Sequence, residues 1–149
     1  MEDIQQVFSD LIRFEAKLWT ALDGRLRTEH DLPLQKFDIM RVIASTRDCR
    51  VYDIVGELSL TTGGVSKLVD ALESSGYTSR RPNPRDRRSS IIELTPAGRK
   101  ALARANKTFN AELEAWFGSA LSGRALRQLG DALSGLRAAA KEAAGVRAA

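Results

Sequence analysis

Basic side chains are concentrated in one short segment of the sequence, residues 77–100. The segment holds seven of them against two acidic side chains and therefore carries a charge of +5. The whole chain has a formal net charge of +4, so the remaining residues sum to −1. The seven are Arg80, Arg81, Arg85, Arg87, Arg88, Arg99 and Lys100. Such a concentration is typical of a surface that faces phosphate groups, although a solvated loop could carry the same charge.

At the start of this segment the hydrophobic period changes from that of a helix to that of a strand. Residues 77–81 and 90–94 read as two short strands, and the Pro- and Asn-containing stretch 82–88 lies between them. The sequence therefore predicts a β-hairpin with a long basic tip.

At this tip, Asp86 is flanked by Arg85, Arg87 and Arg88. A carboxylate can hold one guanidinium in an extended pose through a bidentate ion pair. An arginine oriented in this way can enter the minor groove of DNA, where the negative potential is enhanced. The alternative is a surface cluster that neutralises itself. The elements upstream favour the first interpretation.

Those elements are two short helices separated by a tight turn. The first of the two short helices covers about 52–58, and the second starts at Thr61 or Thr62, so that only Ser59 and Leu60 lie between them. Another helix precedes both. It starts at Leu34, and its inward residues are Phe37, Met40, Ile43 and Ala44. The inward face of the second short helix is Val65, Leu68, Val69 and Leu72. Gly76 ends it by accepting a left-handed conformation.

The other face of that helix is small and polar. It presents Thr61, Thr62, Gly63, Gly64, Ser66, Lys67 and Asp70. An α-helix fits the major groove, where such side chains allow close approach to base edges and phosphates. The two glycines cost about 1 kcal/mol each relative to alanine, which suggests close approach to a partner, although they could simply shape the helix start. Two helices joined by a tight turn and followed by a basic hairpin define a winged helix-turn-helix.

Long helices flank this lobe on both sides. The first runs to about Arg27, and its apolar stripe is Ile4, Val7, Phe8, Leu11, Phe14, Leu18 and Leu22. After the hairpin, Thr95 caps a long helix with Pro96 at its first position. A last helix begins near Ser122. Its residues Leu126, Leu129, Leu133, Leu136 and Ala140 are spaced 3-4-3-4 and form a seam suited to pairing with another helix. We therefore expect a mainly α fold of about six helices with one small β-hairpin.

Two segments resemble a known family. Residues 83–98, with the run Asn-Pro-Arg-Asp-Arg-Arg, closely resemble the wing signature of MarR-family transcriptional regulators. Residues 61–70, continuing to Gly76 and Tyr77, are similar to their recognition helix and its exit, and Leu32-Pro33-Leu34 also matches. The resemblance covers nearly the whole chain.

The resemblance implies a homodimer that binds double-stranded DNA at a pseudo-palindromic operator. It places Asp86 and the minor-groove arginine Arg88 in the wing, with Arg87 on phosphate. The full set of expected DNA contacts is Ser59, Thr61, Thr62, Gly63, Ser66, Lys67, Arg81, Arg85, Asp86, Arg87 and Arg88. Residues 34–97 would form the winged helix-turn-helix lobe of a single domain, and residues 1–33 and 98–149 its dimerisation helices.

The resemblance also implies a repressor whose operator binding is relieved by a small, often aromatic or phenolic effector. The region between the lobe and the dimerisation helices would draw on Phe14, Trp19, His30, Phe37 and Met40. An aromatic and methionine stripe is also what a hydrophobic core looks like. A constitutive DNA-binding or architectural protein without any ligand is the alternative, as is a winged-helix module that binds proteins.

The remaining features bound the function further. No apolar run is long enough for a membrane helix, the N-terminus lacks a secretory signal, and a single cysteine suits a reducing compartment, so we expect a cytoplasmic protein.

Cys49 is expected near a short strand before the third helix. It could sense oxidants if Arg47 and Arg50 lowered its pKa, but an incidental thiol is favoured. The single histidine, His30, is expected in a solvated loop. One histidine and one cysteine support neither a metal site nor the catalytic residues of an enzyme, and no cofactor is predicted.

Overall fold

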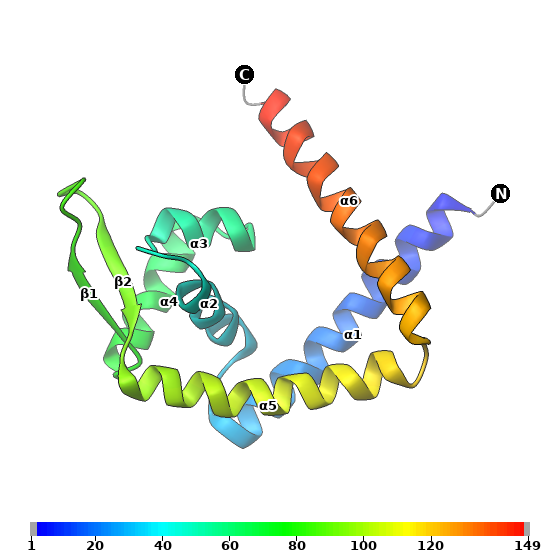
Figure 1. The fold of residues 1–149 in the computed structure, drawn as a ribbon, viewed down its shortest axis with the longest axis horizontal. Coiled ribbons are helices and arrows are strands. Elements are labelled where there is room, and N and C mark those ends of the chain that lie inside the picture. Colours follow the sequence, from blue (N-terminus) through cyan, green and yellow to red (C-terminus); the bar gives the residue numbers. More distant parts are fainter. Residues whose placement is uncertain (1–2, 148–149) are drawn as a thin grey trace. The chain divides into compact units, whose positions relative to one another are not determined.

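The computed structural model describes residues 3–147, which form six helices and one two-stranded antiparallel hairpin (Figure 1). In chain order the elements are α1 (Ile4–His30), α2 (Leu34–Ser45), α3 (Val51–Leu58), α4 (Thr62–Ser74), β1 (Thr78–Pro82), β2 (Ser90–Leu94), α5 (Pro96–Gly118) and α6 (Gly123–Arg147). The expected mainly helical fold with a single hairpin is confirmed. The chain divides into two compact units after Asn110. No helix within residues 3–147 combines the length and apolar character that a membrane span requires.

Helix α1 runs one turn beyond its predicted end near Arg27. Asp3 caps its N-terminus by accepting a hydrogen bond from the Gln5 backbone N–H at 2.9 Å. At the other end Asp31 adopts the left-handed conformation, with φ of 50°, and its backbone N–H donates to the carbonyl of Arg27. This cap ends the helix, since an aspartate tolerates positive φ better than most residues.

The hydrophobic core of the first unit is built around α2. Buried residues of α2 pack against α1, α3, α4 and β2. The Phe37 ring also contacts that of Phe109 on α5. The largest fully buried side chains include Phe37, Leu26, Leu34, Ile39, Met40, Ile54, Leu72 and Ile92. The inward face predicted for α4 is buried at Val65, Val69 and Leu72, with Leu68 half-buried. Ala44 was expected to face inward but is exposed.

The junction of α4, the hairpin and α5 is tightly packed. Gly76 has φ of 78°, the left-handed conformation predicted for it. The Thr95 hydroxyl donates to the carbonyl of Gly76 at 2.6 Å and accepts from the backbone N–H of Gly98 at 3.0 Å, which caps α5. At Gly98 an added Cβ would lie 2.0 Å from the Tyr77 carbonyl oxygen. This junction sets the direction in which the hairpin leaves the core.

The hairpin pairs Thr78 with Leu94 at its base and Pro82 with Ser90 near its tip. The first strand starts and ends one residue later than predicted. The expected strand near Cys49 is wrong, because the described residues before α3 form a turn and a loop. A single backbone hydrogen bond, from the Ile92 N–H to the Cys49 carbonyl at 2.7 Å, joins this loop to β2.

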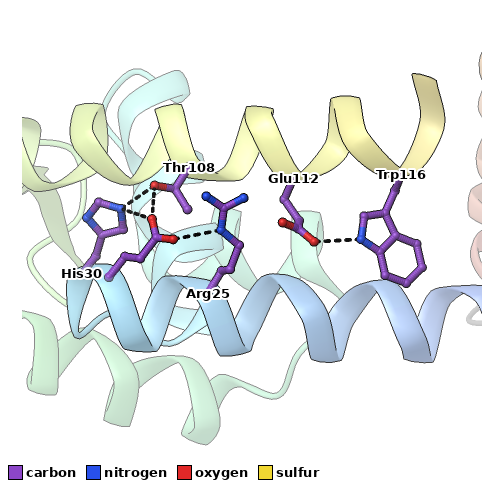
Figure 2. A network of polar contacts seen from close by, with 6 residues as sticks. Arg25, His30, Thr108, Glu112 and Trp116 are labelled. Atoms are coloured by element: carbon purple, nitrogen blue, oxygen red, sulfur yellow. Dashed lines mark hydrogen bonds and ion pairs between the residues drawn. The ribbon is translucent and has the colours of Figure 1, made fainter. Parts of the chain in front are cut away.

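A polar network ties the C-terminal end of α1 to α5 (Figure 2). The Thr108 hydroxyl donates to Glu29 at 2.9 Å, and Arg25 donates to the other oxygen of that carboxylate at 3.0 Å. His30 Nε2 lies 2.8 Å from the same hydroxyl. Since the hydroxyl has only one proton, it must accept from His30, so Nε2 carries the hydrogen. His30, predicted in a solvated loop, is therefore the half-buried last residue of a helix.

The second unit holds the end of α5 and α6. The Trp116 indole N–H donates to Glu112 one turn earlier at 2.8 Å (Figure 2). Ser122 caps α6 by accepting from the Ala125 backbone N–H at 3.3 Å, close to the predicted start. Three of the predicted seam residues, Leu126, Leu133 and Leu136, are exposed.

Candidate nucleic-acid interface

The predicted recognition helix is α4, and its polar face is accessible. Thr61 is its N-cap, and the Thr61 hydroxyl accepts from the Gly64 backbone N–H at 3.1 Å. Thr62 and Lys67 are exposed, and Ser66 is half-buried. Ser59 ends α3 in the left-handed conformation with φ of 53°, which produces the tight turn between the two helices.

The two glycines at the start of α4 differ in what requires them. A Cβ at Gly64 would meet the capping hydroxyl of Thr61 at 2.9 Å, so the cap explains this glycine. At Gly63 an added Cβ would meet nothing within 4 Å. Packing within the chain therefore does not account for Gly63, and it stays a candidate for close approach of a partner.

The hairpin tip is shaped by two polar side chains that bind backbone. The Asn83 side-chain oxygen accepts from the Arg85 N–H at 3.0 Å, and Asp86 Oδ1 accepts from the Arg88 N–H at 2.9 Å. Both are bonds to the residue two positions on, the pattern with which Asn and Asp stabilise turns. Asn83 is buried, and its amide also donates to the Ser89 hydroxyl at 3.2 Å.

The expected ion-pair clamp at Asp86 is wrong. Its carboxylate accepts from the Arg88 backbone and, at 3.4 Å, from the Ser89 hydroxyl. In the described part of the chain no guanidinium pairs with Asp86. Arg85, Arg87 and Arg88 are all exposed. Asp86 therefore shapes the backbone at Arg88 and leaves the guanidinium available.

The two arginines on the first strand of the hairpin are paired with acids. Arg80 Nη2 lies 2.6 Å from Asp70, and Arg80 also pairs with Glu73. Arg81 lies 2.7 Å from Glu93 and 2.7 Å from Asp48. The hydrogen bonds to Asp70 and Glu93 raise the pKa of Arg80 and Arg81 respectively above the ordinary arginine value. The uncompensated positive charge of the wing is therefore at its tip.

The recognition helix and the tip line one groove. It has a volume of about 630 Å³ and is lined by Arg50, Val51, Tyr52, Thr62, Ser66, Arg80, Asp86, Arg88, Ser89, Ser90 and Ile92. The structure thus brings together the two clusters that the sequence places some 20 residues apart. Of the predicted DNA contacts, four line this groove, namely Thr62, Ser66, Asp86 and Arg88. The other seven do not line it, namely Ser59, Thr61, Gly63, Lys67, Arg81, Arg85 and Arg87. The guanidinium of Arg81 is engaged elsewhere.

Sequence reasoning missed two residues of this groove, Arg50 and Tyr52. Tyr52 is 77% exposed, and the Arg50 guanidinium lies 6.0 Å from the centre of its ring. Asp53 accepts from the Arg50 backbone N–H at 2.8 Å and caps the start of α3. The signal in the sequence that could have indicated them is an arginine two positions before an aromatic residue at the start of a helix.

The five residues expected around an effector do not share one cavity. Phe37 and Met40 are fully buried in the core, and the Phe37 ring lies 4.8 Å from that of Phe109. Phe14 and Trp19 lie on α1 and are 38% and 42% exposed. His30 lines a cavity of about 460 Å³ with Thr28, Glu29, Asp31, Leu32, Tyr77, Ala101 and Arg104.

Cys49 has the surroundings of a structural thiol. It is 1% exposed, and burial, reinforced by the nearby Asp53 carboxylate, raises its pKa to about 11. Arg50 acts in the opposite direction but does not outweigh these effects. Because the thiolate is the reactive form, the thiol is unreactive near neutral pH. Within residues 3–147 no group of three or more His, Cys, Asp or Glu side chains could hold a metal ion.

The order of elements, with two short helices, a tight turn and a basic hairpin on one face, defines a winged helix-turn-helix protein. Residues 32–90 match the model of the MarR family. An HTH-type transcriptional regulator from Bacillus cereus is 30% identical over 95 residues, which are 64% of this chain and 62% of the length of that protein. The segment 32–90 belongs to the MarR family, which confirms the resemblance seen in the wing and recognition-helix motifs.

Solved structures agree over most of the chain. A MarR/EmrR family transcriptional regulator from Acinetobacter sp. ADP1 has a TM-score of 0.79 and 25% identity, covering 95% of this chain and 99% of its own. Sco3205, a MarR family transcriptional regulator from Streptomyces coelicolor solved in complex with DNA, has a TM-score of 0.82 and 21% identity, covering 89% of this chain and 84% of its own. These likenesses extend the shared fold to the flanking helices.

Proposed function

We propose that this protein is a sequence-specific transcriptional regulator that binds double-stranded DNA as a homodimer. The observation that carries the proposal is the shared groove, in which Thr62 and Ser66 of α4 face the same space as Arg88 of the wing. A duplex presents a major groove to a helix and, beside it, a minor groove to a hairpin tip. The relative solved in complex with DNA has the same fold.

The contacts divide between the two elements. The start and polar face of α4, with Ser59, Thr61, Thr62, Gly63, Ser66 and Lys67, read the major groove and its adjacent phosphates. Arg88 enters the minor groove, and Arg85 and Arg87 contact phosphates. Asp86 acts through the backbone of Arg88. We assign Arg81 to holding the wing rather than to DNA, because its Nε and Nη2 bind two carboxylates of this chain.

Arg50 and Tyr52 extend this surface to the start of α3. Arginine and tyrosine are common donors to phosphate oxygens, and both line the groove beside Thr62. The exposure of Tyr52 is high for an aromatic side chain, whose ring is usually largely buried. A bound phosphate would give this ring and the adjacent guanidinium a common role.

The dimer is supported by apolar residues left exposed in the single chain. On α1 these are Ile4, Val7, Phe8, Leu11, Ile12 and Phe14, with exposed fractions from 38% to 80%. On α6 they are Leu126, Leu133 and Leu136. Several large apolar side chains exposed along one helix mark an association site. We accordingly assign residues 1–33 and 98–149 to dimerisation and residues 34–97 to the DNA-binding lobe.

We further infer, from the family resemblance, that the protein represses transcription and that a small aromatic ligand relieves its binding to the operator. The cavity beside His30 is the place where one of the expected effector residues meets open space. A thermal-shift screen with phenolic acids tests this part separately. A raised melting temperature and weakened DNA binding support an effector, whereas no shift favours a constitutive DNA-binding protein.

The deciding experiment measures the affinity of the purified protein for duplex DNA from the intergenic region upstream of its own gene. A scrambled duplex is measured alongside, each at two salt concentrations. We expect preference for the intergenic duplex and an affinity that falls with salt. Arg88→Ala should cost about 1–3 kcal/mol of binding free energy. Lys36→Gln, which removes the same charge from a half-buried position on α2, serves as control. Equal, weak binding to both duplexes by the wild-type protein contradicts the proposal.

A further inference from the structure

Arg80 bridges two carboxylates of the recognition helix. Its Nη2 lies 2.6 Å from Asp70, and its Nη1 pairs with Glu73, so both terminal nitrogens of the guanidinium are in use. Asp70 and Glu73 are three residues apart on α4 and therefore lie on one face of the helix. The bridge joins the first strand of the wing to α4.

The carboxylates belong to the element that would lie against DNA. They follow Ser66 and Lys67 along α4, and Arg80 lines the groove that holds Ser66 and Arg88. The Asp70 side chain is 66% exposed and that of Glu73 42%. Two negative charges on this helix would repel the phosphate backbone unless a cation compensates them.

Stability of the fold does not account for the bridge. Arg80 is 30% exposed, and ion pairs between partly exposed side chains add little to the stability of a fold because water screens them. With its terminal nitrogens already bound, Arg80 is also poorly placed to contact a phosphate directly. Its local effect is to compensate charge on α4.

We propose that Arg80 is a positioning residue for DNA binding, which acts by neutralising Asp70 and Glu73 on the recognition helix. The proposal rests on the proposed function, since it requires that α4 faces DNA. It assigns to Arg80 an indirect role that differs from the direct contacts of Arg85, Arg87 and Arg88.

The test compares four proteins with the wild type in operator affinity, salt dependence and melting temperature. They are Arg80→Gln, the double variant Asp70→Asn/Glu73→Gln, the triple variant that combines them, and Lys36→Gln on α2 as a charge-matched control. Arg80→Gln should bind about tenfold more weakly, a loss of about 1.4 kcal/mol. Its melting temperature should stay close to that of the wild type. The triple variant should recover affinity near the wild-type value, because no carboxylate is then left unpaired.

The outcomes separate the possible roles of Arg80. Recovery in the triple variant supports compensation of charge. Weak binding by both Arg80→Gln and the triple variant, with a salt slope reduced by about 1, overturns it in favour of a direct phosphate contact. Unchanged affinity of Arg80→Gln also overturns it. If Arg80→Gln does not fold, the double variant decides, since it should bind at least as tightly as the wild type and weaker binding refutes the proposal. Failure of the proposed function itself is recognised separately, because the wild type would then not prefer the operator.

Discussion

The carboxylate of Asp86 accepts a hydrogen bond from the backbone N–H of Arg88, with the two atoms 2.9 Å apart. The bond fixes the local path of the chain at the tip of the wing rather than the direction of any guanidinium. Asn83 makes the equivalent bond to the N–H of Arg85. Short polar side chains thus determine where the tip arginines leave the backbone.

Substitution of Asp86 distinguishes a backbone role from an ion-pair role. Asp86→Ala removes the acceptor, so the tip should loosen and operator affinity should fall by about 1 kcal/mol. Asp86→Asn keeps an oxygen that can accept from the Arg88 N–H and should bind nearly as well as the wild type. Fluorescence anisotropy with a labelled operator measures both. Equal losses in the two variants would instead indicate that the negative charge matters.

Removal of the cap at Thr61 should destabilise α4. Thr61→Ala leaves the Gly64 N–H without its side-chain acceptor and should lower the free energy of unfolding by about 1 kcal/mol. Thr61→Ser retains the hydroxyl and should restore most of it. Urea denaturation monitored by circular dichroism gives both values. A Thr61→Ala protein as stable as the wild type would show that the cap contributes nothing.

Alanine substitutions at two glycines should have opposite effects. Gly98→Ala would place its Cβ 2.0 Å from the Tyr77 carbonyl oxygen, and because both atoms are held by backbone the junction of the hairpin and α5 should be severely destabilised. Gly56 lies within α3, where an added Cβ meets nothing within 4 Å. Gly56→Ala should therefore stabilise the protein by about 0.5–1 kcal/mol. Thermal denaturation of the two variants compares them, and a tolerated Gly98→Ala would contradict the packing described.

Cys49 should react slowly with alkylating reagents at neutral pH. Its pKa of about 11 means that the thiolate fraction, and with it the rate, should rise with pH until the pH reaches that value. Mass spectrometry after iodoacetamide treatment of the native protein at a series of pH values measures the rate, and the unfolded protein is the control. Rapid modification at pH 7 would revive an oxidant-sensing role.

The sequence was sufficient to place most elements and to find the wing and the recognition helix. Their signals are local, since the caps at Thr61 and Thr95, the left-handed Gly76 and the periodic apolar face of α4 act within a few residues. The same reasoning ended α1 near Arg27, one turn too early, because the helix continues to His30 and ends at the left-handed Asp31. Local chemistry therefore determined the secondary structure and the family motifs.

Only the tertiary structure decided which basic residues are free. Arg81 meets Asp48, 33 positions away in sequence, and Arg80 meets Asp70, 10 positions away, whereas the tip arginines extend beyond the reach of such partners. It also decided that Phe37 and Met40 fill the core and that Cys49 is buried beside β2. Pairing and burial depend on which distant segments the fold brings within a few ångströms, and no period or local motif in the sequence encodes that proximity.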